Sequence, residues 1–296
     1  MPFMPDKITS VIARESDGNI QITFTVPFSV VRKAGDETLK EFAKDAEIPG
    51  FRKGMAPIAK VAEKVPQSKI IEHSLSHILP KALSEAVTDN NLKIAVYPKF
   101  ELISAEEGKD WQIRGVTCEL PEVAPGDYKK AVQGAFRASS LWTPGSGKPG
   151  DKKELTVEQK EQVVIKTILE NVKITIPRIL IEEEADSRLS NLLSRLEKLG
   201  LALETYLSSI GKKAEDLRAD YANQAKDAIA LDLILTKIAQ DEDIKADPKE
   251  VDSAMGIAQA SKSGKDGAPE DTDGRKRLLE SILKRRGALD FLIKLG

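Results

Sequence analysis

A stretch rich in Ser, Gly, Pro and Lys, residues 139–153, separates two parts of the sequence that differ in hydrophobic periodicity. Before it, short runs alternate apolar and polar residues, as half-buried strands do. After it, from Thr156 onward, apolar residues recur at helical spacing to the end of the chain. A linker between two such patterns favours two folding units. A chain of 296 residues is long enough for each unit to bury its own core.

The first part predicts an α+β domain. Alternation is clearest at residues 20–26, where Ile20, Ile22 and Phe24 would face a core, and the turn residues 16–19 would join this strand to an earlier one. Pro80 lies inside a helical pattern and should kink or break that helix. The order β-β-α-α-α-β-β favours a largely antiparallel sheet with helices. The expected strands are 7–14, 20–26, 93–103 and 109–120, and the expected helices are 30–46, 57–65 and 68–90.

The second part predicts an all-α domain. Pro177 would open one helix, Gly200 would end it, and Leu189, Leu192, Leu196 and Leu199 would form its apolar stripe. The sequence therefore predicts an α+β domain at residues 1–130, a linker at 131–155 and a helical domain at 156–296. The expected helices are 156–171, 177–199, 203–209, 214–240, one that starts near 248, and 274–294.

Charge and composition exclude several classes of protein. Lys and Arg number 45 and Asp and Glu number 47, so the net charge of -2 excludes a histone-like basic protein and an acidic tail protein. The single cysteine, Cys118, excludes an intramolecular disulfide framework and a multi-cysteine metal site. The first residues lack the pattern of a signal peptide, and no apolar run reaches membrane-spanning length. We expect a cytoplasmic protein.

Two motifs suggest chemistry but have simpler interpretations. Residues 145–150 have the glycine spacing of a dinucleotide-binding loop, but no strand precedes them, so we interpret them as linker and expect no cofactor. His73 and His77 lie one helical turn apart and could hold a metal ion from one face. They supply two ligands where a catalytic zinc takes three, and they lie opposite the apolar stripe of their helix. We therefore expect two solvated histidines and no metal.

The loop at residues 48–57, here called the Phe51 loop, combines an aromatic residue with cations. Phe51 lies beside Arg52 and Lys53 and between two glycines, and further lysines follow at positions 60, 64 and 69. An apolar anchor inside a cationic patch suits an anionic partner with a pocket, such as a ribonucleoprotein surface. The alternative is that Phe51 packs under the loop and the cations are merely solvated.

The same loop resembles the ribosome-docking signature of the trigger factor family, glycine-Phe-Arg-x-Gly-x-x-Pro. The matching residues are Gly50, Phe51, Arg52, Gly54 and Pro57, and Lys53 is also of the usual type. The order of strands and helices around the loop is similar to the N-terminal domain of that family. Residues 168–254 resemble its helical chaperone domain. The resemblance covers most of the chain from about residue 7 to residue 254.

Most members of the family carry a peptidyl-prolyl isomerase domain between these two domains. Here only the segment near residues 139–153 occupies that place, which is far too short for about 100 residues of domain. The resemblance therefore implies the chaperone function without the isomerase activity, and we expect no enzymatic activity. No constellation of nucleophile, base and orienting group suggests another enzyme.

The resemblance implies a ribosome-associated chaperone that docks near the polypeptide exit tunnel and shields nascent chains. Its partners would be a protein and adjacent RNA of the large ribosomal subunit, and unfolded nascent polypeptides. Phe51 would be the apolar anchor, Arg52 the main cation and Lys53 a second charge. Gly50 and Gly54 would permit the tight loop, and Pro57 would start the next helix.

Three alternatives stay open from the sequence. The chain could be a helical holdase or assembly chaperone that works without the ribosome. It could form a homodimer when free, as some members of the family do. A basic cluster near the C-terminus could be a second RNA contact or simply a solvated helical face; its members are Arg275, Lys276, Arg277, Lys284, Arg285 and Arg286.

Overall fold

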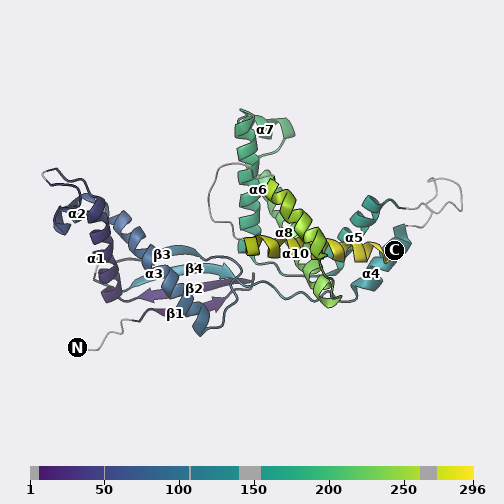
Figure 1. Cartoon of the computed structure of the whole chain (residues 1–296), viewed down its shortest axis with the longest axis horizontal. Coiled ribbons are helices and arrows are strands. Elements are labelled where there is room, and N and C mark those ends of the chain that lie inside the picture. Colours follow the sequence, from purple (N-terminus) through teal and green to yellow (C-terminus); the bar gives the residue numbers. More distant parts are fainter. Residues whose placement is uncertain (1–6, 50, 107, 140–154, 261–271) are drawn as a thin grey trace. The chain divides into compact units, whose positions relative to one another are not determined.

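The structure is a computed structural model that describes residues 7–49, 51–106, 108–139, 155–260 and 272–296. It divides into two compact units (Figure 1). Unit 1 comprises Met1–Leu120 and Pro177–Leu180, and unit 2 comprises Pro121–Ile176 and Ile181–Gly296. In the described residues, no helix has the length and apolar content that crossing a bilayer requires.

Unit 1 contains the predicted antiparallel sheet. Its strands are β1 (Thr9–Arg14), β2 (Asn19–Val26), β3 (Lys99–Ser104) and β4 (Trp111–Cys118), in the order β1-β2-β4-β3. The alternation at residues 20–26 is confirmed, because Ile22, Phe24 and Val26 are fully buried while the polar residues between them are not. The third predicted strand begins later than expected, and Ile94 forms only an isolated bridge with Glu119.

Two long helices cover one face of this sheet. They are α1 (Phe28–Asp45) and α3 (Gln67–Asp89), and the short α2 (Ile58–Lys64) lies between them in sequence (Figure 1). One core joins β2 and β4 to Val31 of α1 and to Leu79 and Leu83 of α3. Of the two predicted effects of Pro80, a kink or a break, the break does not occur, since α3 continues through this residue. Burial of apolar residues on both sides of Pro80 holds the two halves of α3 against the same core.

A short segment from the second half of the chain also belongs to unit 1. The backbone N–H of Ile179 donates to Oδ1 of Asn19 at 3.2 Å, and Pro177 lies against Gly18 in the turn between β1 and β2. Gly18 has φ +84°, and a Cβ there would lie 3.1 Å from Pro177 Cγ. The turn therefore needs glycine both for its backbone and for this contact.

Unit 2 is helical, as predicted. Its helices are α4 (Tyr128–Ser139), α5 (Val157–Asn171), α6 (Arg178–Lys198), α7 (Leu203–Ile210), α8 (Ala214–Asp241), α9 (Pro248–Ala260) and α10 (Thr272–Ile293). The first three residues of α6, up to Leu180, belong to unit 1. The core brings together α4, α5, α8 and α10 through fully buried residues such as Val132, Val164, Ile234 and Leu292. Gly200 has φ +67° just after α6, which agrees with its predicted role as a helix stop.

Helix α4 differs from the prediction. The predicted domain boundary lay at residue 130 and the linker at 131–155, but the two units divide at Leu120 and α4 runs through Ser139. Tyr128, Val132 and Phe136 are buried against the core of unit 2, so this segment is structural rather than a spacer. Residues 140–154, which include the glycine-rich motif at 145–150, lie outside the described residues.

Candidate functional site

The Phe51 loop is supported by a small apolar core of its own. Ala43 at the end of α1, Ile48 and Ala56 in the loop, and Val61 of α2 are all buried together. Phe42, Ala46 and Val65 pack against this cluster. The cluster holds both ends of the loop against α1 and α2, and the residues between these ends form its tip.

Backbone hydrogen bonds shape the loop between these ends. The N–H of Phe51 donates to the carbonyl oxygen of Ile48 at 3.0 Å, and the N–H of Met55 donates to that of Arg52 at 2.9 Å. A longer bond of 3.4 Å runs from the N–H of Gly54 to the carbonyl oxygen of Ala46 and links the two sides of the loop. The loop is thus two successive turns tied back to the end of α1.

Gly54 is required by its surroundings. Its φ is +78°, a left-handed conformation that L side chains rarely adopt. A Cβ at this position would lie 2.9 Å from the carbonyl oxygen of Lys44, which is too close. The predicted role of this glycine in a tight loop agrees with this geometry, whereas Gly50 lies outside the described residues.

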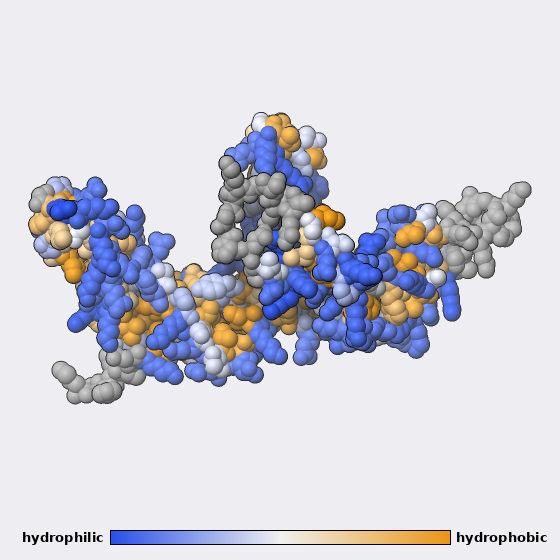
Figure 2. All heavy atoms as spheres, in the orientation of Figure 1, coloured by the Kyte–Doolittle hydropathy of each residue, from blue (hydrophilic) through white to orange (hydrophobic). Residues whose placement is uncertain are grey.

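Three apolar side chains at the tip of the loop and the start of α2 are exposed to solvent. Phe51 is 45% exposed, Met55 is 73% exposed and Ile58, at the start of α2, is 42% exposed. Figure 2 shows hydrophobic surface at the end of unit 1 that carries α2. Phe51 is therefore not fully packed under the loop, and its exposed part is open to a partner. Sequence reasoning missed Met55 and Ile58, although both follow Phe51 closely in the chain.

The cations of the loop are exposed and held only weakly. Lys53 Nζ lies 3.5 Å from Asp45 Oδ1 and Lys60 Nζ lies 2.8 Å from Glu63 Oε2, both in ion pairs between exposed side chains. Such pairs contribute little to stability and are readily exchanged for other partners. Arg52 makes no ion pair with any residue that the structure describes. Its guanidinium therefore remains available for a carboxylate or phosphate.

The structure brings most of the predicted site residues together. Phe51, Arg52, Lys53 and Gly54 lie in consecutive positions at the tip of the loop. Pro57 directly precedes α2, with φ -57°, and both Lys60 and Val61 donate backbone hydrogen bonds to its carbonyl oxygen. Pro57 thus starts the helix, as the sequence predicted.

Unit 2 exposes a second group of apolar side chains, here called the α6–α7 tip. It consists of Leu193, Leu199, Leu201 and Ile210, which are between 39% and 71% exposed. Leu199 was predicted as part of the buried stripe of its helix, but it is the most exposed of the four, because it follows the last residue of α6. Only Leu196 of that predicted stripe is fully buried. Hydrophobic surface around α7 is visible in Figure 2.

The basic cluster near the C-terminus is partly engaged within unit 2. Arg285 lies 2.7 Å from Asp232 of α8, and Arg286 lies 3.5 Å from Asp290. Burial raises the pKa of Asp232 even though Arg285 acts in the opposite direction. These contacts favour a structural role for Arg285, whose side chain is mostly buried, whereas Arg286 pairs with Asp290 only between exposed side chains.

Family models match both parts of the chain. The model described as bacterial trigger factor protein matches residues 9–135, and the model described as bacterial trigger factor protein C-terminus matches residues 150–294. Together they cover the sheet, the Phe51 loop and the helices of unit 2, and only residues 136–149 lie between them.

Curated relatives match over a shorter stretch. The trigger factor of Streptococcus agalactiae serotype Ia is 36% identical over 108 residues, which are 36% of this chain and 25% of the relative. The trigger factor of Streptococcus mutans is 38% identical over the same length, and that of Streptococcus pyogenes serotype M1 is 36% identical over 111 residues, or 38% of this chain and 26% of the relative. The chain thus spans about a quarter of the length of these relatives.

One solved structure shares the fold of this chain. It is a structure of the trigger factor chaperone, from work on promiscuous substrate recognition in folding and assembly activities. Its TM-score is 0.58 at 15% sequence identity, and the match covers 96% of this chain and 99% of that one. The fold, the two family models and the curated relatives agree. The chain therefore belongs to the trigger factor family.

Proposed function

We propose that this protein is a chaperone that docks on the large ribosomal subunit beside the exit tunnel through the Phe51 loop. The observation that carries the proposal is the exposure of Phe51 beside the exposed cations Arg52 and Lys53, on a loop that its own small core holds in place. A rigid loop loses little conformational entropy on binding, which favours docking.

Each residue of the loop has a separate role in this proposal. Phe51 is the anchor that enters an apolar pocket of the partner, with Met55 beside it. Arg52 bonds a carboxylate or phosphate with its planar fork of donors, and Lys53 adds a charge without fixed direction. Gly54 keeps the backbone in the conformation that exposes these side chains. Because the cations are exposed, the interaction should weaken as salt rises.

Nascent chains would be held by apolar surface elsewhere in the protein. The α6–α7 tip offers several exposed aliphatic side chains in a surrounding of charged residues. Unfolded polypeptides expose apolar residues in no fixed arrangement, so many weak contacts serve better than one deep pocket. We also propose that the protein is cytoplasmic and has no prolyl isomerase activity. A protease-coupled assay on a proline peptide tests the second point, and catalysis would contradict it.

Co-sedimentation with ribosomes tests the docking proposal. The variant F51A/R52A/K53A should lose most of its binding, because truncating an aromatic anchor costs about 2 kcal/mol or more, roughly a thirty-fold loss of affinity. A matched control, V11A/K81A/K93A, removes one exposed apolar residue and two exposed lysines elsewhere in unit 1 and should bind like the wild type. Both should be measured at low and moderate salt.

Two results would redirect the proposal. Equal binding by wild type and F51A/R52A/K53A would exclude the Phe51 loop as the dock and would turn attention to the basic residues of α10. Absence of binding by all three proteins at low salt would favour a holdase that works without the ribosome. In that case suppression of aggregation by the wild type, and its loss on replacing Leu199 and Leu201 by Ser, would support the α6–α7 tip as the client site.

A further inference from the structure

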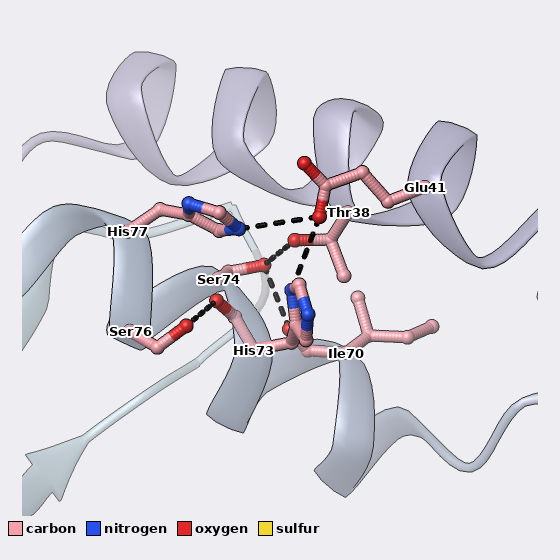
Figure 3. Close-up of polar contacts among 7 residues, drawn as sticks. All are labelled: Thr38, Glu41, Ile70, His73, Ser74, Ser76 and His77. Carbon is pink, nitrogen blue, oxygen red and sulfur yellow. Dashed lines mark hydrogen bonds and ion pairs between the residues drawn. The ribbon is translucent and has the colours of Figure 1, made fainter. Parts of the chain in front are cut away.

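Two helices of unit 1 bring three potential metal ligands together. Glu41 lies near the end of α1, and His73 and His77 lie one turn apart on α3. Glu41 Oε2 is 3.3 Å from His77 Nε2 and 3.7 Å from His73 Nδ1 (Figure 3). The three ligand atoms all lie within 4.8 Å of one another. The histidines alone supply two ligands, and the fold adds a third from a residue 32 positions before the first of them.

The two separations that involve Glu41 suit one tetrahedral ion, and the imidazole nitrogens lie within 4.8 Å of each other. Two ligand atoms that bind the same Zn²⁺ at about 2.0–2.1 Å lie about 3.3–3.4 Å apart when the geometry is tetrahedral. The two contacts of Glu41, at 3.3 and 3.7 Å, are close to that separation. Small side-chain rotations would bring both imidazoles to one ion.

His73 has a ring nitrogen that needs a partner. Its Nδ1 atom is buried, and among the buried side-chain nitrogen and oxygen atoms of the described residues it alone has no hydrogen-bond partner. The ring is held edge-on by Phe42, with centroids 4.9 Å apart, and its other neighbour is the ring of His77, 5.0 Å away. An unpaired buried nitrogen is unfavourable, and a metal ion would satisfy it. The sequence predicted that His73 is solvated, but the structure places its ring between Phe42 and His77 with Nδ1 buried.

A buried hydrogen-bond network holds the two helices together beside the cluster. Ser74 Oγ donates to the carbonyl oxygen of Ile70 at 2.7 Å, which uses its only hydrogen, so Thr38 Oγ1 donates to Ser74 Oγ at 3.1 Å (Figure 3). Both hydroxyl side chains belong to buried residues. The network fixes the spacing of α1 and α3, and with it the position of Glu41 relative to the histidines.

We propose that Glu41, His73 and His77 bind one first-row transition metal ion, with Zn²⁺ as the expected occupant. Two imidazoles and one carboxylate suit Zn²⁺ and its neighbours better than Mg²⁺ or Ca²⁺, which prefer oxygen ligands. Water would complete the coordination, because Glu41 and both histidines are partly exposed. The ion would tie the end of α1, directly before the Phe51 loop, to α3 and would stabilise unit 1.

The sequence makes this site easy to test. The chain has two histidines and one cysteine, Cys118, which is fully buried in β4. The full chain, prepared without a polyhistidine tag, should bind one equivalent of Zn²⁺ in calorimetry with a dissociation constant below about 0.1 mM. The imidazole signals of both histidines should shift in NMR. Co²⁺ should give d–d absorption bands without the charge-transfer band of a thiolate.

Single variants separate this site from adventitious binding. His77→Gln and Glu41→Gln should each weaken Zn²⁺ binding by about tenfold or more, since even the loss of a residue that supports a ligand has effects of that size. Glu72→Gln removes an exposed carboxylate on the same turn of α3 and should bind like the wild type. Circular dichroism checks that each variant is folded.

Three results would overturn the proposal. They are no calorimetric binding of Zn²⁺ by the wild type, binding that leaves both histidine signals unchanged, and equal weakening by E72Q and H77Q. None of these measurements involves ribosomes, so the outcome is independent of the docking proposal.

Discussion

Gly54 and Gly35 show how differently two glycines in one unit can act. Gly54 adopts φ +78° and has the carbonyl oxygen of Lys44 where a Cβ would lie. Gly35 lies inside α1, where a Cβ would meet nothing within 4 Å. The sequence placed Gly54 in a motif, but only the structure shows why no other residue fits there. Gly35 carries no such requirement.

Gly54→Ala should destabilise unit 1 by at least about 1–2 kcal/mol, the penalty for a left-handed L residue, with the close contact in addition. Gly35→Ala should stabilise it by up to about 1 kcal/mol, because alanine is the better helix former. Urea unfolding followed by the fluorescence of Trp111, in a Trp142→Phe background, reports on unit 1, since Trp111 lies in its core. Equal effects of the two substitutions would contradict this account of Gly54.

The buried pair Thr38 and Ser74 is a second case where residue type alone was uninformative. Both are polar residues inside helical patterns, and nothing in the sequence indicates that they meet. The structure buries both hydroxyls and orders their hydrogen bonds from Thr38 to Ser74 to Ile70. The two residues are therefore not equivalent, because Thr38 depends on Ser74 as its acceptor.

Ser74→Ala should destabilise unit 1 by about 1–3 kcal/mol, because it leaves the Thr38 hydroxyl buried without an acceptor. Thr38→Val keeps the bond of Ser74 to Ile70 and should cost only about 0.5–1.5 kcal/mol. The same fluorescence experiment compares the two variants. A larger loss for Thr38→Val than for Ser74→Ala would show that the donor has been assigned in the wrong direction.

At the scale of elements, strongly periodic segments were predictable and irregular ones were not. The alternation in β2 and the long amphipathic helices specify their own structure, since burial of one face decides it. Helix α4 was missed because prolines and glycines before and after it indicate a linker. The spacing of Tyr128, Val132 and Phe136, four residues apart, is the signal that could have found it.

Helix α4 is attached to the core through a hydrogen bond that should respond to high pH. The Tyr128 hydroxyl donates to Glu242 Oε1 at 2.6 Å, and Lys129 Nζ lies 2.7 Å from the same oxygen. Burial, followed by the hydrogen bond to Glu242, raises the pKa of Tyr128 well above its usual value. The hydrogen bonds from Lys129 and Tyr128 lower the pKa of Glu242.

A raised pKa in the folded state means that the folded protein resists ionisation of Tyr128 while the unfolded chain does not. The resulting stability is present below about pH 10, the usual pKa of tyrosine, and declines as the pH rises above it. Tyr128→Phe should cost about 1–2 kcal/mol at neutral pH and should reduce this alkaline decline. Urea unfolding of unit 2, followed by circular dichroism at several alkaline pH values, compares the two proteins. Parallel curves for wild type and variant would contradict the prediction.

At the scale of the whole molecule, the division into an α+β unit and a helical unit could be predicted from periodicity alone. The position of the boundary between the units could not be predicted in this way. Helix α4 packs in unit 2, and the segment Pro177–Leu180 packs in unit 1, each in a different unit from the one that its place in the sequence suggests. Both exchanges depend on side-chain contacts between residues far apart in the chain. The same is true of the site residues, since the Phe51 motif is local in sequence whereas Glu41 meets His73 and His77 only through the fold.

The central claim is that the exposed tip of the Phe51 loop itself touches the ribosome. Replacing Phe51 by a photo-crosslinking amino acid, and separately replacing Val11, which is 69% exposed on strand β1, tests this most directly. On illumination with ribosomes at low salt, position 51 should crosslink to a protein or RNA of the large subunit and position 11 should not. Crosslinks from position 11 with none from position 51 would contradict the account.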